Sequence, residues 1–381
     1  MPSPFALAAE EAGTSPHAAA TEFPGAHSDV KSPSVDDRLT NQTADFAQEV
    51  SREATFVEVA AQDLAAQIQQ DSRSIALIQR ELLDRCRVSR SHAGRWHILP
   101  NPALADEVAR MLGWCRRLAQ NGQRPVLVVT DTYVKNLIGQ FREKLCVASL
   151  PVRFIVIPEV GSGETRDVFH ANGRAHAVLA FLRLLPDTVI MAPKDGWELR
   201  QMLRLAADHD GPIALQIPRG RLPAVHFPDF VEEIDFGKAE ILEDGDDVAL
   251  LTLGALAAPA VEAAVTLSQQ GLSVGVVNAR FVQPLDAECL IRIARRVRGI
   301  VTVEDNAANG GFGSAVLELL ASRGLTTPVV VTGAAGDAGD TDSAKTIAQI
   351  IRSATALVEH RGHPDFPAWD HEPRQLAAGH T

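Results

Sequence analysis

Short apolar runs that alternate with helical segments are the feature that most restricts how this chain can fold. The runs RPVLVVTD, VRFIVIPEV, DTVIMAPKD and GPIALQIPRG have the length and apolar content of buried strands. Segments with helical spacing, such as WELRQMLRLAADHD, separate them. Buried strands that alternate with helices form parallel sheets in which helices cover both faces. The pattern therefore predicts an α/β fold.

A Pro-containing acidic stretch, RLPAVHFPDFVEEIDFG, interrupts the alternation, and a second set of strands and helices follows it. We therefore expect two domains, at residues 53–235 and 236–360, each with a mostly parallel twisted sheet flanked by helices. Residues 1–52 contain too few large apolar side chains to offset the entropy of ordering, so we expect a disordered tail there. A second tail is expected at residues 361–381.

Composition restricts the partners and the cell compartment. The 381 residues carry a net charge of −12, which disfavours nucleic acid and anionic membranes as partners. No apolar run has the roughly 20 residues that a membrane span requires. The four cysteines are far apart and form no CxxC pair, which is typical of reduced thiols and not of disulfides or a zinc site. We expect a cytoplasmic protein without a metal site of its own.

The stretch GIVTVEDNAANGGFGSAVLELLASRG, from Gly299 to Gly324, has two interpretations. An apolar strand, a glycine-rich loop and an amphipathic helix form a phosphate cradle in some nucleotide-binding proteins. The same order also forms a tight strand-to-helix turn. The glycine spacing differs from GxGxxG, and no ribose-binding acid follows in the expected context, which favours the turn.

Four blocks carry a resemblance to a known family. MAPKDGWELRQML, GPIALQIPRG, VNARFVQPLD and VTVEDNAANGGFGSAVLELL resemble the C-terminal half of 1-deoxy-D-xylulose-5-phosphate synthase, a thiamine diphosphate enzyme of the transketolase superfamily. The resemblance is strong at residues 186–324 and weaker at residues 94–183. It implies a pyrimidine-binding domain followed by a transketolase C-terminal domain. In such a C-terminal domain the glycines let the chain turn and approach a neighbouring chain closely, and do not hold the coenzyme diphosphate.

The resemblance also implies a partner. Superfamily members hold thiamine diphosphate between two domains, one of which supplies a GDG…N segment that binds Mg²⁺ and the diphosphate. No GDG segment followed by a suitably spaced Asn occurs in this sequence. We therefore expect that thiamine diphosphate and Mg²⁺ bind only together with a separate chain that supplies the diphosphate domain. The assembly would be a homodimer or a heterotetramer, and the isolated chain would be inactive.

Two candidate residues correspond to the coenzyme side of such a site. An ungapped count places Val108 where the family has the glutamate that activates the coenzyme, with Glu107 one residue earlier. Glu107 is thus either the catalytic acid or an ordinary first-turn acid favoured by the helix dipole. Tyr133, in TDTYVKNLIGQ, either stacks on the pyrimidine or covers the start of its helix.

Two further candidates correspond to the substrate side. His170, in the loop GETRDVFHANGRAHAV, either moves a proton for the substrate, as the resemblance implies, or belongs to a solvated loop. Arg219, in IPRG, follows a buried strand and corresponds to the family arginine that binds the substrate phosphate. The planar guanidinium suits this role because it bonds two oxygens together. The expected substrate is a small phosphorylated sugar.

Three functions follow from these observations. The first is a transketolase-like or 1-deoxy-D-xylulose-5-phosphate synthase-like transferase subunit, which moves a two-carbon unit from a ketose or 2-oxoacid donor to an aldehyde acceptor. It would serve isoprenoid or specialised biosynthesis. The second is a non-catalytic family member that acts as a dimerisation or regulatory partner. The third is a β-type subunit of a 2-oxoacid dehydrogenase.

Overall fold

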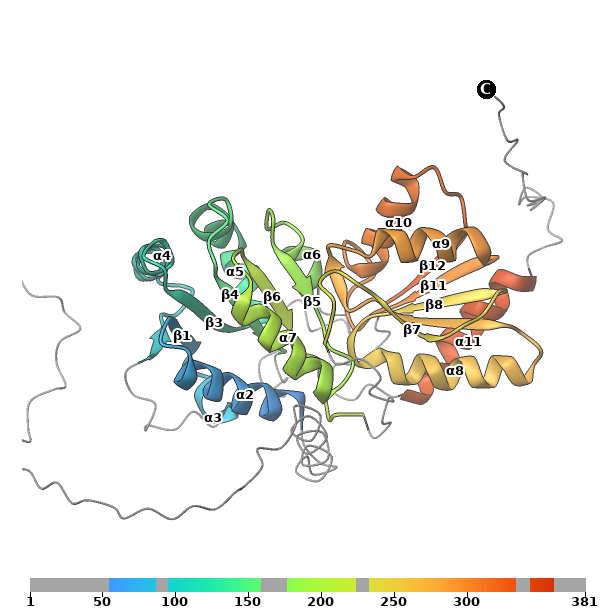
Figure 1. Cartoon of the computed structure of the whole chain (residues 1–381), viewed down its shortest axis with the longest axis horizontal. Coiled ribbons are helices and arrows are strands. Elements are labelled where there is room, and N and C mark those ends of the chain that lie inside the picture. Colours follow the sequence, from blue (N-terminus) through green and yellow to red (C-terminus); the bar gives the residue numbers. More distant parts are fainter. Residues whose placement is uncertain (1–54, 87–94, 159–176, 224–232, 334–342, 360–381) are drawn as a thin grey trace, which may run out of the picture. The chain divides into compact units, whose positions relative to one another are not determined.

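The computed structural model describes residues 55–86, 95–158, 177–223, 233–333 and 343–359 (Figure 1). These residues all belong to one compact unit. The expected tails at residues 1–52 and 361–381 lie outside the described residues, as does His170.

The first sheet has seven strands in the order β10-β5-β6-β4-β3-β1-β2. All neighbouring pairs are parallel except β10 and β5, which run antiparallel. The strands are β1 (Ser74–Gln79), β2 (Trp96–Leu99), β3 (Arg124–Thr130), β4 (Arg153–Ile157), β5 (Val189–Met191), β6 (Ile213–Gln216) and β10 (Phe281–Gln283).

Helices cover both faces of this sheet, as the alternating pattern predicts. Successive residues of a strand enter different apolar clusters: Leu127 and Val129 pack with one set of helices, whereas Val126 and Val128 pack with the other. The first set is α4 (Ala105–Gln120), α5 (Asp131–Phe141), the π-helix η2 (Arg142–Cys146) and α6 (Val178–Leu182). The second set is α2 (Phe56–Gln70), α3 (Leu82–Arg85) and α7 (Gly196–Asp208).

Side-chain caps fix where three of these helices begin. Thr55 and Glu58 form a capping box at the start of α2. The Thr130 hydroxyl accepts from the Tyr133 amide at the start of α5, and the Asp195 carboxylate accepts from the Glu198 amide at the start of α7. Each cap satisfies an amide that has no partner within its own helix. The loops at the strand ends are thereby fixed.

The second sheet has five strands in the order β12-β11-β8-β9-β7, of which only β7 runs antiparallel to its neighbour. Helices α8 and α11 pack on one face and α9 and α10 on the other, as Figure 1 shows. The elements are β7 (Glu240–Glu243), β8 (Val248–Thr252), the 3-10 turn η3 (Gly254–Leu256), α8 (Ala257–Gln269), β9 (Val274–Asn278), α9 (Ala287–Arg296), β11 (Gly299–Val303), α10 (Phe312–Ser322), β12 (Val329–Thr332) and α11 (Ser343–Glu359). The predicted fold of two mostly parallel sheets flanked by helices is confirmed.

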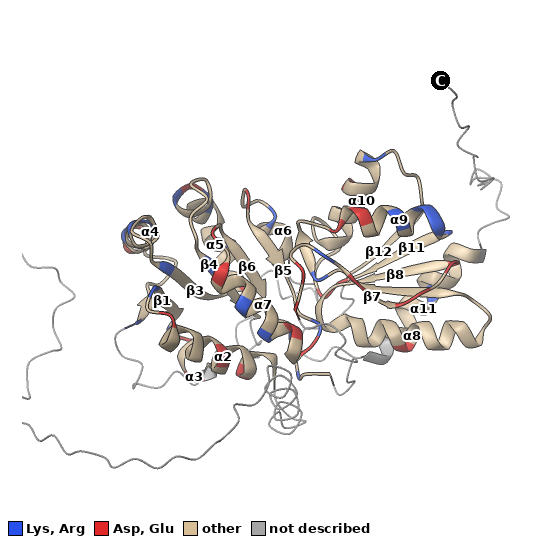
Figure 2. Ribbon diagram, in the orientation of Figure 1, with Lys and Arg blue, Asp and Glu red and all other residues tan. Residues whose placement is uncertain are grey.

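Charged side chains of both signs are interspersed over the helices and loops around both sheets (Figure 2). Among the described residues, no helix has the length and apolar character that a membrane crossing requires. The cysteines, all four of which are described, are buried and free of disulfides.

The two sheets are joined by the chain itself. After β9 of the second sheet, the chain crosses to the first sheet and forms β10 beside β5. The backbone of Ala192 donates to the carbonyl oxygen of Arg280, 3.0 Å away. The segments MAPKDGWELRQML and VNARFVQPLD, which lie about 80 residues apart in the sequence, therefore meet at the junction of the sheets.

A buried charge network occupies this junction. The Glu198 carboxylate has no exposed surface and lies 2.6 Å from Arg280 Nε and 3.4 Å from Lys194 Nζ. Glu240 Oε2 lies 3.0 Å from Lys194 Nζ and 3.2 Å from Arg280 Nη2. Asn278 donates to both carboxylates. Burial alone would raise the pKa of Glu198, but Lys194 and Arg280 outweigh it and lower the pKa, so this group is ionised.

Removing one cation from this network leaves a buried carboxylate without full compensation. We expect Arg280→Ala to lower the free energy of unfolding by about 3 to 5 kcal/mol. The matched control is Arg298→Ala, because Arg298 is 42% exposed and forms a surface ion pair with Asp247. Its loss should cost less than about 1 kcal/mol. Urea denaturation of the three proteins measures both effects, and equal losses would show that the junction network does not stabilise the fold.

Candidate functional site

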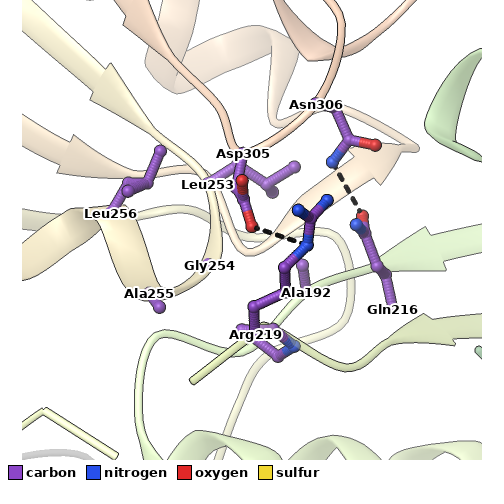
Figure 3. A pocket seen from close by; sticks show the side chains of 10 residues that line it. Ala192, Gln216, Arg219, Leu253, Gly254, Ala255, Leu256, Asp305 and Asn306 are labelled. Carbon is purple, nitrogen blue, oxygen red and sulfur yellow. Dashed lines mark hydrogen bonds and ion pairs between the residues drawn. The ribbon is translucent and has the colours of Figure 1, made fainter. Parts of the chain in front are cut away.

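A pocket lies where the carboxyl ends of strands from both sheets meet (Figure 3). Ligands of open parallel sheets bind beyond the carboxyl ends of the strands. The loops after β5 and β6 form one side of this pocket, and the segments after β8 and β11 form the other. Its lining consists of Ala192, Gln216, Pro218, Arg219, Leu253, Gly254, Ala255, Leu256, Asp305 and Asn306.

Arg219 reaches into the pocket from the turn after β6. Gly220 has a φ of +80°, a left-handed conformation that ends the strand sharply, and its carbonyl oxygen accepts from the Phe56 amide at 3.4 Å. The turn is thus tied to the start of α2. The Arg219 Nε atom lies 3.7 Å from Oδ2 of Asp305, across the pocket. About a fifth of each side chain is exposed.

Amide side chains close the pocket beside this ion pair. Asn306 Nδ2 donates to Gln216 Oε1 at 3.3 Å, which links the end of β11 to the end of β6 (Figure 3). The Asn306 side-chain oxygen accepts from the Leu179 amide at the start of α6. The pocket has a cavity volume of about 20 Å³, which is about the space of a single water molecule.

The glycine-rich loop after β11 wraps around a carboxyl group of the chain itself. Glu304 is fully buried, and its two oxygens accept from the Phe312 and Gly313 amides, both at 2.9 Å, at the start of α10. A side chain at Gly311 would collide with this carboxyl group. The helix N-terminus, where a phosphate would bind in a cradle, is thus filled by Glu304.

The other side of the loop is held by a cation. Arg183 Nη1 donates to the carbonyl oxygen of Gly310 at 2.8 Å and to that of Gly311 at 3.2 Å. Gly310 has a φ of +78° and passes so close to Ala180 that a Cβ would lie 2.9 Å from the Ala180 methyl. The prediction of a packing turn is therefore confirmed, and the close approach that the glycines allow includes contacts within this chain.

Glu107 and Val108 lie at the start of α4 and differ in exposure. Val108 is buried in the apolar cluster beside the first sheet, whereas the Glu107 side chain is exposed. Because α4 leads directly into β3, its first turn lies toward the carboxyl side of the sheet. The residue that aligns with the family glutamate by an ungapped count thus belongs to the core, and the adjacent carboxylate faces outward.

Tyr133 lies in the first turn of α5, at the carboxyl end of β3, and its side chain is buried. The hydroxyl donates to the carbonyl oxygen of Pro100 at 3.1 Å, and the ring centroid lies 6.4 Å from that of Phe141. Burial raises the pKa of Tyr133. In this structure the ring is covered by the chain's own residues.

Glu107, Tyr133 and Arg219 all lie toward the carboxyl ends of the strands of the first sheet. Their side chains do not contact one another directly. Strand β4 lies between β3, which Tyr133 follows, and β6, which Arg219 follows. No hydrogen bond or ion pair among the described residues joins any two of these three side chains. The described part of the chain also contains no group of three or more His, Cys, Asp or Glu residues that could hold a metal ion.

The two acids and the amide that follow β11 were not predicted as site residues from the sequence. Glu304, Asp305 and Asn306 directly follow a buried strand, and polar residues in that position are a general signal for the carboxyl edge of a parallel sheet. Each of the three has a different partner: the start of α10, Arg219, and Gln216. The signal was present, but the partners could not be assigned without the fold.

Glu304 makes the stability of the fold depend on pH. Burial raises its pKa from 4.5 to about 7, even though the two amides favour the ionised form. Its stabilising contribution is therefore complete below pH 4.5 and is lost as the pH rises through 7. We expect the free energy of unfolding of the wild type, relative to Glu304→Gln, to fall by on the order of 3 kcal/mol between pH 4.5 and pH 8.

Urea denaturation across this pH range measures the difference. Glu318→Gln is the matched control, because Glu318 lies on α10 as well but is 66% exposed. Its pH profile should follow that of the wild type. Parallel profiles for the wild type and Glu304→Gln would contradict the raised pKa.

Comparison with known proteins finds a family model and relatives that match parts of this chain. Residues 237–349 match the family model described as "Transketolase, C-terminal domain". A 1-deoxy-D-xylulose-5-phosphate synthase of Geobacter sulfurreducens is 44% identical over 209 residues, which are 55% of this chain and 32% of that protein. The synthase of Synechococcus elongatus is 38% identical over 220 residues, which are 57% of this chain and 34% of that protein. The chain thus spans about a third of the length of these relatives.

A solved structure has the same fold. It is titled "Split gene transketolase, inactive beta4 tetramer", and it matches with a TM-score of 0.67 and 22% sequence identity, over 81% of this chain and 99% of that chain. The resemblance expected from the four sequence blocks is confirmed: the chain contains a transketolase C-terminal domain at residues 237–349 and is related to the C-terminal part of 1-deoxy-D-xylulose-5-phosphate synthases.

Proposed function

We propose that this chain is one subunit of a split thiamine diphosphate enzyme that transfers a two-carbon unit to a phosphorylated aldehyde. The donor is a ketose or a 2-oxoacid. One observation carries the proposal. This chain matches 99% of the solved chain titled as a split-gene transketolase, whereas it matches only about a third of each synthase. In this proposal a separate chain supplies the diphosphate domain and Mg²⁺, in a homodimer or heterotetramer in the cytoplasm.

The domain boundaries and the tails belong to the same proposal. Residues 53–235 would be the pyrimidine-binding domain and residues 236–360 the C-terminal domain, with tails at 1–52 and 361–381. Strand β10, which belongs to residues 236–360, pairs with β5 of the first sheet, so the two domains are joined by a strand pair. A rigid junction of this kind suits a subunit that presents one wall of a site to another chain.

The described residues fit thiamine diphosphate in part. The exposed carboxylate of Glu107 is available to a coenzyme that another chain holds. The ring of Tyr133 is covered in this structure, so it offers no open face to a pyrimidine. When bound, the coenzyme supplies the carbanion chemistry of two-carbon transfer. This chain would activate it through Glu107, hold the substrate phosphate through Arg219, and move a proton through His170.

The buried Val108 and the outward Glu107 favour a second candidate function. If no carboxylate reaches the coenzyme, the chain is a non-catalytic partner that stabilises or regulates an active relative. The two candidates differ in one measurable property, the requirement for Glu107 in a reconstituted assembly.

Reconstitution tests the proposal. The chain alone, titrated with thiamine diphosphate and Mg²⁺ in a calorimeter, should bind no coenzyme. Mixed with a chain that carries a GDG…N segment, it should catalyse carboligation that requires both the coenzyme and the metal. Tight coenzyme binding by the isolated chain would contradict the split site.

Glu107→Gln in the reconstituted assembly separates the two candidates. A catalytic Glu107 predicts that exchange of the thiazolium C2 proton slows by at least about 100-fold. Asp106→Asn, which removes an exposed acid from the same helical turn, should leave the exchange rate unchanged. An unchanged rate in Glu107→Gln would assign the chain a non-catalytic role.

A further inference from the structure

Gln216 lines the same pocket as Arg219 and carries an amide nitrogen that the described part of the chain leaves unused. We propose that the Gln216 side-chain amide is a further ligand-binding group, which together with the Arg219 guanidinium forms one subsite for a phosphate. This subsite distinguishes a phosphate from a carboxylate. The inference deepens the proposed function and rests on the phosphate role that it assigns to Arg219.

A chain of hydrogen bonds fixes which way the Gln216 amide points. The Leu179 backbone amide can only donate, and it donates to the Asn306 side-chain oxygen at 3.4 Å. The Asn306 side-chain nitrogen therefore lies on the other side, where it donates to Gln216 Oε1 at 3.3 Å. Because this bond takes the oxygen of Gln216, its Nε2 atom lies on the opposite side of the amide. Figure 3 shows this nitrogen on the side of Arg219.

The donors of Gln216 and Arg219 are available to a ligand. Within the described residues, Gln216 Nε2 has no hydrogen-bond acceptor and the Arg219 guanidinium donates no hydrogen bond. Asp305 Oδ2 lies 3.7 Å from Arg219 Nε, which is longer than a hydrogen bond. The terminal nitrogens of the guanidinium can therefore bind an anion while Asp305 keeps its place beside Nε.

The space beside these donors suits one oxygen atom of an anion. The cavity volume of about 20 Å³ is about that of a single water molecule. The Arg219 side chain is 22% exposed, so the guanidinium can be reached from solvent. An anion can thus place one oxygen among the donors and keep the rest of the molecule toward solvent.

The number of donors favours a tetrahedral anion over a planar one. The planar guanidinium can bind two oxygens of a phosphate or of a carboxylate side by side. A carboxylate has no further oxygen, whereas a phosphate ester has a third terminal oxygen. Gln216 Nε2 can donate to that third oxygen. Gln216 therefore supplies the difference in affinity between the two kinds of anion.

Anion binding by the full chain tests this inference without the partner or the coenzyme. Methyl phosphate and acetate are titrated into the wild type and Gln216→Met by calorimetry at low salt. Methionine is similar in length to glutamine but cannot donate a hydrogen bond. We expect Gln216→Met to bind methyl phosphate about tenfold more weakly, because one hydrogen bond to a charged group is lost. Its affinity for acetate should stay unchanged.

A second variant separates ligand binding from a structural role of Gln216. Gln216→Glu keeps the oxygen that accepts from Asn306 but replaces the donor with a charged acceptor, so it should weaken methyl phosphate binding more than Gln216→Met does. Gln270→Met is the matched control, because Gln270 is exposed at the C-terminal end of α8. It should leave both affinities unchanged. A thermal melt establishes that each variant is folded.

The outcomes separate this inference from the proposed function. If Arg219→Gln abolishes methyl phosphate binding but both Gln216 variants bind it as the wild type does, Gln216 is no ligand-binding residue and the phosphate role of Arg219 stands. If Gln216→Met weakens methyl phosphate and acetate equally, Gln216 only shapes the pocket and the inference is overturned. If the wild type binds no methyl phosphate, or if binding persists without Arg219, both the subsite and the phosphate role of Arg219 are wrong.

Discussion

A carboxylate buried between two cations is the interaction on which the rest of this structure depends. Glu198 lies at the start of α7, beside the first sheet, and Arg280 lies between β9 and β10, where the chain leaves the second sheet. Because an ionised group without exposed surface is costly unless paired, Glu198, Lys194 and Arg280 stabilise the fold only when the two sheets meet. The pocket exists for the same reason, since Arg219 comes from one sheet and Asp305 from the other.

Two positions that could bind an anion, the start of α10 and the Arg219 guanidinium, are paired with acids of the chain itself. Glu304 takes the amides at the start of α10, and Asp305, the next residue, pairs with Arg219. These two acids differ in accessibility. Glu304 is buried beside Gly311 and holds the loop in shape, whereas Asp305 lines the pocket. These adjacent acids thus serve different parts of the structure: Glu304 the glycine-rich loop and Asp305 the pocket.

The alternation of strands and helices and the glycine turn could be predicted because both depend on neighbours in sequence. The junction could not, because Glu198 and Arg280 are 82 residues apart, and β10 is a three-residue strand whose sheet only the fold determines. Arg219 was identified from the family resemblance and from its position after a strand, but its partner Asp305 was not identified. The sequence also indicated that Glu107 lies one residue before the position of the family glutamate, which Val108 occupies. The structure adds that Val108 is buried and Glu107 is exposed. His170 and its loop remain predictions.

Native-state hydrogen exchange in increasing urea tests most directly whether the two sheets form one cooperative unit. We expect that the slowest amides of β4, in the first sheet, and of β8, in the second, converge on a single opening free energy equal to that of global unfolding. Separate openings, with β8 exchanging at a lower free energy while β4 stays protected, would show that the junction does not couple the sheets.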